Sequence, residues 1–168
     1  YPTSIIHGLV HVQMLIFAVV NLEMASDLGT SVTEIGFIGT IGYFLFGLGA
    51  LPAGFLIDKI GARKVLVLCV SGMAIADALI AFGGSSIFVM SGLALMGLSA
   101  SLYHPAGLGL ISRNVEQRGH ALGIHGTYSN VLVAFGTLFN GFVASQFGWK
   151  AAYVWPIIPM VFFAVMYY

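Results

Sequence analysis

Six long apolar runs dominate the sequence and limit what this chain can fold into. Each run is close to the roughly 20 residues that an α-helix needs to cross the hydrocarbon core of a bilayer. They lie at about Ser4–Met24, Thr33–Ile57, Arg63–Phe82, Ser86–Ser112, His120–Phe147 and Trp149–Tyr168. The runs are continuous, whereas a transmembrane β-barrel shows short alternating segments. The sequence therefore predicts an all-α membrane protein with six transmembrane helices.

Charged residues are too scarce to cover a soluble protein of this size. They make up 7% of the 168 residues, whereas about 25% is usual in a soluble domain. This composition excludes a soluble enzyme and a nucleic-acid binder, and the formal net charge of zero points to no polyanionic partner. We expect an integral membrane protein that is not an enzyme, needs no cofactor and has the lipid bilayer as its first partner.

Basic residues are distributed unequally between the connections, which predicts the orientation. Five of the six lie after the second and fourth runs, at Lys59, Arg63, Lys64, Arg113 and Arg118. Because Lys and Arg concentrate in cytoplasmic loops, these two connections are expected in the cytoplasm. With six spans, both termini are then cytoplasmic, and we expect the bacterial cytoplasmic (inner) membrane.

The glycines repeat at an offset of 87 residues. Five of the seven glycines between positions 36 and 61 find a glycine at this offset, among them the pairs Gly49–Gly136 and Gly61–Gly148. An offset of three helices makes the two copies cross the membrane in opposite senses, as in many secondary transporters. We predict a single bundle over residues 1–168, built from two inverted three-helix repeats at about 4–82 and 86–168.

One ordered motif stands between the second and third runs. It combines a glycine, an aspartate four residues further on, and basic residues around a second glycine, at Gly54, Asp58, Lys59, Gly61, Arg63 and Lys64. This order resembles the loop signature of the major facilitator superfamily. The resemblance implies the amino-terminal half of a twelve-helix transporter, in which Asp58 pairs with Arg63 and steadies one conformational state.

Three further stretches are similar to the fosmidomycin-resistance-type branch of that superfamily: Ser101–Gly107, Arg118–Gly126 and Phe147–Tyr153. Two positions depart from the drug–proton antiporters of the superfamily. Leu93 stands where many carry an arginine, and Thr137 follows a glycine where a proline is usual. These departures weaken drug antiport as an interpretation and leave transport intact.

The resemblance also implies alternating access around a midplane site and a second six-helix bundle. That bundle is a missing carboxy-terminal half, a second copy or a paralogue. In this family, helices one and four line the cavity, and helices two and five face the other half. The transported substrate is then a small molecule or an ion.

Ionisable side chains inside spans are costly and mark a pathway by default. Four imidazoles lie inside predicted spans, while His120 starts the fifth span in water. Imidazole exchanges protons near neutral pH, which proton coupling requires. The predicted substrate or proton pathway comprises His7, His11, Tyr103, His104, His125, Tyr128 and Asn130. The alternative is that these histidines only hydrogen-bond between helices, an interpretation that we favour for His125.

Two further interpretations stay open. His7, His11 and Met14 lie at helical spacing on one face, and imidazole with thioether suits copper, so a metal transporter is one alternative. A half-sized structural subunit of a larger membrane complex is another, although a scaffold has no need of polar groups in lipid.

The remaining polar residues and the prolines yield structural expectations. Asp77 is expected to bond a neighbouring helix, and Glu23, Asp27 and Glu34 to be solvated around the first connection. A proline removes a helical hydrogen bond, so we expect Pro105 to break the fourth helix beside the cavity and Pro156 to bend the sixth.

Overall fold

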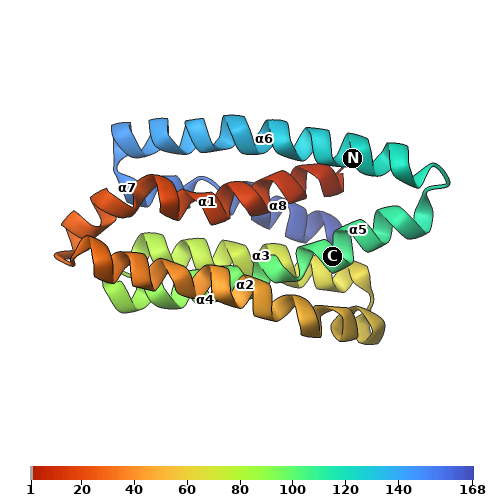
Figure 1. Cartoon of the computed structure of the whole chain (residues 1–168), viewed down its shortest axis with the longest axis horizontal. Coiled ribbons are helices and arrows are strands. Elements are labelled where there is room, and N and C mark those ends of the chain that lie inside the picture. Colours follow the sequence, from red (N-terminus) through yellow and green to blue (C-terminus); the bar gives the residue numbers. More distant parts are fainter. Residues whose placement is uncertain (1) are drawn as a thin grey trace.

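The computed structural model describes residues 2–168 and is a bundle of helices, with no strand among these residues (Figure 1). The helices are α1 (Pro2–Leu28), α2 (Val32–Ile60), α3 (Ala62–Phe82), α4 (Ser86–Ser101), α5 (Tyr103–Asn114), α6 (Arg118–Phe147), α7 (Trp149–Val154) and α8 (Ile157–Tyr167). α4 with α5, and α7 with α8, each form one span, so six segments are long and apolar enough to cross a membrane. The predicted fold class is confirmed.

Prolines divide the fourth and sixth spans, as expected. Pro105 has no N–H to donate to the Ser101 carbonyl, and α4 ends at Ser101. The backbone N–H of Leu102 donates instead to the Ser99 carbonyl at 3.2 Å, which closes a tighter turn before α5 begins. Pro156 stands between α7 and α8 in the same way. The break at Leu102 brings the start of α5 toward α1.

Two glycines 87 residues apart end the second and fifth spans with the same backbone geometry. Gly61 has φ 84° and ψ 151°, and Gly148 has φ 82° and ψ 160°. Each backbone N–H donates to the carbonyl four residues earlier at 2.8 Å, and each glycine directly precedes the next helix. A positive φ is costly for other residues, so glycine is required at both turns. The match agrees with the predicted repeat, whose superposition over all three helices stays a prediction.

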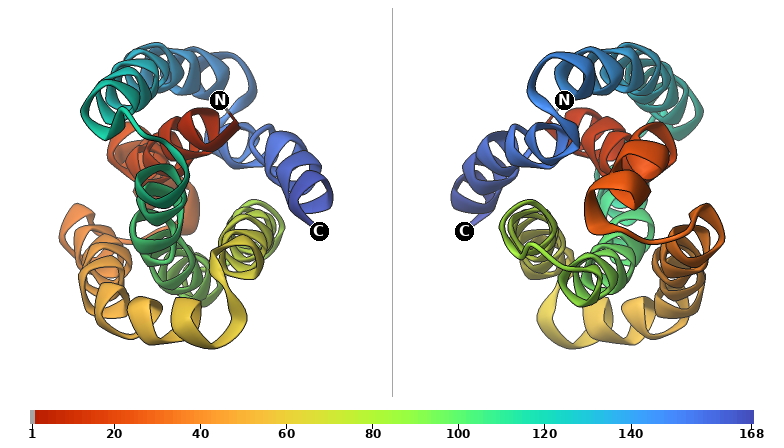
Figure 2. Two further views of the ribbon diagram at one scale, coloured as in Figure 1. Left: turned by 90° about the vertical axis from the view of Figure 1, so that its right-hand side faces the viewer. Right: turned by 90° about the vertical axis from the view of Figure 1, so that its left-hand side faces the viewer.

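Four pairs of helices make the most extensive contacts in the bundle. α1 lies along α6, while α2 and α3 both lie along α4, and α8 packs on α3. Viewed along the bundle, α5 lies near the centre (Figure 2). Both termini lie in the half of the molecule that also holds the α2–α3 and α5–α6 connections (Figure 1).

Close backbone contact between α2 and α4 depends on glycine. A Cβ atom built on Gly97 would lie 2.0 Å from the carbonyl oxygen of Gly42, so only glycine fits there. Small residues allow helices to approach in this way in lipid, where apolar side chains gain little from leaving the bilayer. On α2, Gly42 and Gly49 pack closely against the neighbouring helix. Gly36 does not, because no described atom lies within 4 Å of a Cβ built there.

Glu23 and Asp27 are exposed, as expected, and they also connect α1 to α7. The Trp149 backbone N–H donates to Glu23 Oε1 at 3.2 Å, and the Trp149 indole donates to Asp27 Oδ2 at 3.1 Å. Lys150 Nζ lies 3.3 Å from the same Asp27 oxygen. The Asp27 contacts form because α1 continues one turn beyond the predicted end at Met24.

Asp77 also differs from its expectation. Its side chain is fully buried on α3, and neither carboxylate oxygen has a hydrogen-bond partner among the described residues. The expected bond to a neighbouring helix is therefore wrong for this structure.

Candidate functional site

Three imidazoles meet between α1 and α5. His7 and His11 lie one turn apart on α1, so both point to one side of that helix. Nε2 of His7 lies 3.1 Å from Nε2 of His11 and 3.2 Å from Nε2 of His104. One nitrogen from each of the three rings therefore lies within 4.8 Å of the others. The break before α5 places His104 in this cluster.

A serine on α6 contacts the ring of His7. Ser129 Oγ lies 3.1 Å from the Ser4 carbonyl oxygen, to which its hydroxyl donates, and 2.8 Å from His7 Nδ1. With the hydroxyl proton used in this way, Ser129 Oγ accepts from the Nδ1–H tautomer of a neutral His7. Nε2 of His7 then presents its lone pair to His11 and His104.

The rings of Tyr103 and His125 lie nearly parallel to the ring of His7. The Tyr103 ring stacks on His7 at a centroid distance of 5.0 Å and an angle of 9°, and His125 stacks at 4.8 Å and 6°. The Tyr103 hydroxyl donates to the Thr3 carbonyl at 2.5 Å, and His125 Nδ1 lies 3.0 Å from Ser4 Oγ. His125 Nε2 is buried with no partner among residues 2–168. The cluster is thus ordered by aromatic contacts and by hydrogen bonds from α1 and α6.

A cavity of about 300 Å³ opens beside the cluster. Its lining is mostly apolar, with a few convergent polar groups, and comprises His7, His11, Met14, Leu15, Tyr43, Phe46, Ser129, Asn130 and Val133. Such a lining is typical of small-molecule sites. No acidic or basic side chain other than histidine is among these lining residues.

The predicted pathway residues divide into two groups. The structure brings His7, His11, His104, His125 and Tyr103 together, and Asn130 and Met14 line the adjoining cavity. Tyr128 does not line this cavity, and 63% of its surface is exposed on α6. Of the predicted metal set, His7 and His11 lie with His104 in the cluster and Met14 lines the adjoining cavity, while Tyr128 faces away from this bundle.

Ser4 and Ser129 were missed by sequence reasoning. The signal was present, because Ser4 precedes His7 by three residues and Ser129 follows His125 by four. Those spacings place each serine on the same helix face as its histidine. The hydroxyl of a serine in a membrane helix often donates to a backbone carbonyl of its own helix. A serine in such a helix is therefore weak evidence for a site.

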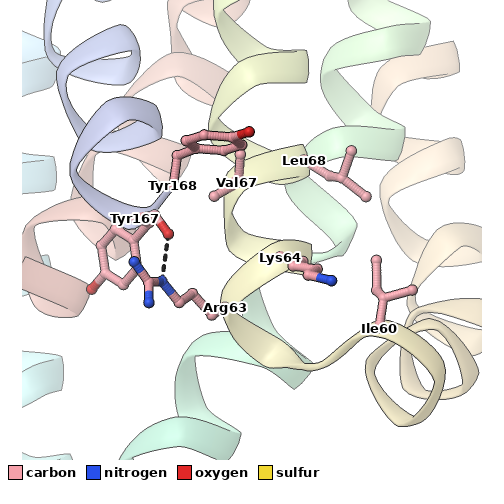
Figure 3. Close-up of a pocket in the computed structure, with 7 residues that line it drawn as sticks. All are labelled: Ile60, Arg63, Lys64, Val67, Leu68, Tyr167 and Tyr168. Atoms are coloured by element: carbon pink, nitrogen blue, oxygen red, sulfur yellow. Dashed lines mark hydrogen bonds between the residues drawn. The ribbon is translucent and has the colours of Figure 1, made fainter.

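The conformational motif lies at the end of the bundle that holds both termini. Asp58 and Lys59 are exposed at the end of α2, and Arg63 Nε donates to the Tyr167 carbonyl at 2.6 Å. A second cavity, of about 400 Å³, lies here between α3 and α8, with Lys64 and the two terminal tyrosines at its edge (Figure 3). Among the described residues no ion pair joins Asp58 to Arg63, so the pairing implied by the resemblance is wrong for this structure.

Six apolar spans with a histidine cluster beside a mostly apolar cavity define an integral membrane protein with a candidate site between its helices. The chain belongs to the Major Facilitator Superfamily, whose family model matches residues 4–168. The superfamily predicted from the Asp58 motif is thereby confirmed.

Individual relatives are transport proteins by name. The chain is 29% identical to the tetracenomycin C resistance and export protein of Streptomyces glaucescens, over 82% of this chain and 26% of that protein. It is 27% identical to the probable L-galactonate transporter of Escherichia coli, over 90% of this chain and 34% of that protein. It is 31% identical to the voltage-gated purine nucleotide uniporter of Homo sapiens, over 79% of this chain and 32% of that protein.

The chain therefore spans about a quarter to a third of the length of these relatives. The family and the relatives' names point to transport rather than catalysis, in agreement with the prediction that the chain is not an enzyme.

Proposed function

We propose that this chain forms one half of a secondary active transporter for small molecules and that the imidazole cluster lines its pathway. The observation that carries the proposal is the convergence of four histidines from α1, α5 and α6 beside a cavity inside the spans. Ionisable groups at this depth are costly unless they serve a pathway or find partners. A scaffold subunit, the structural alternative, gives no reason to keep them.

A second six-helix bundle completes the proposed transporter. α2 and α6 have 22% of their central residues buried, against 56% for α1 and α3, so they present most of their surface outward. Their family counterparts face the opposite half of the transporter. The partner bundle is the carboxy-terminal half of a longer chain, a second copy or a paralogue. Alternating access then consists of one bundle rocking against the other.

Proton coupling is the proposed source of energy. His11, His7 and His104 form a chain of neighbouring ring nitrogens at 3.1 and 3.2 Å, close enough for a proton to pass between rings. Imidazole is the side chain that both accepts and releases protons near neutral pH. The proposed setting is the bacterial inner membrane with both termini in the cytoplasm.

The relatives' names do not agree on one substrate. They mention an antibiotic, a sugar acid and purine nucleotides, so the substrate is proposed only as a small organic molecule. The resemblance to the fosmidomycin-resistance-type branch stays a prediction. It rests on stretches such as Ser101–Gly107.

Uptake by the reconstituted full-length protein tests this function. Proteoliposomes would be supplied with a bacterial small-molecule extract, with and without a proton gradient, and their contents measured by mass spectrometry. We expect at least one compound to accumulate only with the gradient. His104→Gln should abolish that accumulation and spare exchange of the same compound, because exchange needs no net proton movement.

The matched control is His120→Ala. His120 is exposed at the start of α6 and lies outside the cluster, so its loss should leave uptake unchanged. Contents indistinguishable from those of protein-free liposomes would contradict transport. Accumulation that ignores both the gradient and His104→Gln would contradict proton coupling alone.

A transition-metal ion is the second candidate substrate. The observation that favours it is the convergence of three imidazole nitrogens within 4.8 Å of one another. In that case the same histidine substitutions should remove metal uptake, and a proton gradient is not required.

A further inference from the structure

We propose that His7, His11 and His104 bind one divalent transition-metal ion of the Zn²⁺ type through their Nε2 atoms. The fourth coordination position of this ion opens toward the cavity between α1, α2 and α6. The inference rests on the second candidate function and names the ligands of its ion, and equilibrium binding of the ion is measured without transport and without a second bundle.

The spacing of the nitrogens fits such an ion. Zn²⁺ binds imidazole nitrogen at about 2.0–2.1 Å, so two nitrogens of a tetrahedral site stand about 3.4 Å apart. The observed separations from His7 Nε2 are 3.1 Å to His11 and 3.2 Å to His104. All three nitrogens lie within 4.8 Å of one another, so small side-chain rotations complete the site.

The polar contacts of His7 indicate that a bound cation, rather than hydrogen bonds alone, holds the three ring nitrogens together. Nε2 of His7 carries either one N–H or one lone pair, yet it lies 3.1 and 3.2 Å from two neighbouring ring nitrogens. It makes one good hydrogen bond in either tautomer, so the second N···N contact lacks a proper partner. A metal ion uses a lone pair from each ring at once. A hydrogen bond to the opposite ring nitrogen is also the usual way in which proteins orient a metal-binding histidine.

The donor set selects the metal. Three neutral imidazoles suit Zn²⁺, Ni²⁺ and Cu²⁺, and no carboxylate of the kind that Mg²⁺ or Ca²⁺ prefers lines the adjoining cavity within the described chain. Three protein ligands leave one position free, as in zinc sites that exchange a ligand. That position faces a cavity whose lining includes Asn130 and Met14, with room for water or an anion from solution.

Zn²⁺ binding to the full-length protein, purified in detergent, tests the site. Affinity and stoichiometry would be measured by competition with a chromophoric chelator, and Co²⁺ would serve as a spectroscopic probe of tetrahedral coordination. We expect one ion per chain. His11→Gln and His104→Gln should each weaken binding more than about 100-fold, and Ser129→Ala by about 10- to 100-fold, the range seen when a residue behind a ligand is lost.

Two control variants separate this site from its alternatives. Met14→Leu should leave Zn²⁺ affinity unchanged, and a loss with that variant but not with His104→Gln would replace our ligand set with His7, His11 and Met14. His120→Ala should also bind normally, because that histidine is exposed and outside the cluster.

Several results would overturn the inference. These are no binding by the folded protein above the detergent blank, a Co²⁺ spectrum without tetrahedral character, or unchanged affinity in Ser129→Ala together with His104→Gln. If the histidine variants do not fold, the Ser129→Ala affinity and the Co²⁺ spectrum decide. Binding without any transport would leave this site standing and contradict only the proposed function.

Discussion

Substituting Gly97 tests the packing that holds α4, and through it α5 and His104, in place. In Gly97→Ala the new Cβ atom would lie 2.0 Å from the Gly42 carbonyl oxygen and 2.8 Å from its carbon. A tolerable carbon–oxygen contact is about 3.3 Å, so α2 and α4 must separate locally by about 1.3 Å. Both contacting groups are backbone, so no flexible side chain can move aside.

The expected magnitude follows from two opposing effects. Overpacking lowers the free energy of unfolding by about 1–3 kcal/mol. Because both contacting groups here are rigid backbone, we expect a loss of about 2–3 kcal/mol, in the upper part of that range. Alanine regains up to about 1 kcal/mol over glycine inside a helix. We therefore expect the free energy of unfolding to fall by about 1–2 kcal/mol.

Unfolding in mixed detergent and SDS micelles, followed by tryptophan fluorescence, measures this change. The matched control is Gly126→Ala on α6, where nothing described lies within 4 Å of the new Cβ atom. The control should be as stable as the parent or slightly more so. Equal stability of Gly97→Ala and Gly126→Ala would refute the close helix contact.

Two further substitutions test the polar residues outside the cluster. Asp77→Asn should raise the free energy of unfolding in the same assay. The buried carboxylate has no described partner, and an amide costs less free energy to bury. A clear loss of stability would indicate a partner for the charge. Asp58→Asn should shift the balance between inward- and outward-open states, measured by accessibility labelling, and should leave substrate affinity within one state unchanged. An unaltered balance would contradict the conformational role of Asp58.

Much of the fold is readable from local pattern. The spans follow from apolar length, and the breaks at Leu102 and before α8 follow from Pro105 and Pro156. The turn geometry at Gly61 and its counterpart follows from the glycine register. These features depend on residues within one turn of each other, which is why the sequence predicts them.

Features that depend on contacts between helices were less accessible. His7 and His11 were predicted as neighbours from their spacing, but the meeting with His104 joins residues 97 apart in sequence. The end of α1 was placed early because apolar patterning stops at Met24, whereas Asp27 extends the helix and binds Trp149. No local signal specifies such partners.

Water access to the imidazole-lined cavity tests the central claim most directly. Asn130→Cys in the full-length protein, with buried Cys69 replaced by serine, should react with a membrane-impermeant maleimide in membrane vesicles, because Asn130 lines the cavity and thiolates form in water. Ile158→Cys, 75% exposed on α8 where lipid is expected, should stay unreactive. An unreactive Asn130→Cys, or equal reactivity of the two variants, would contradict an aqueous pathway beside the histidines.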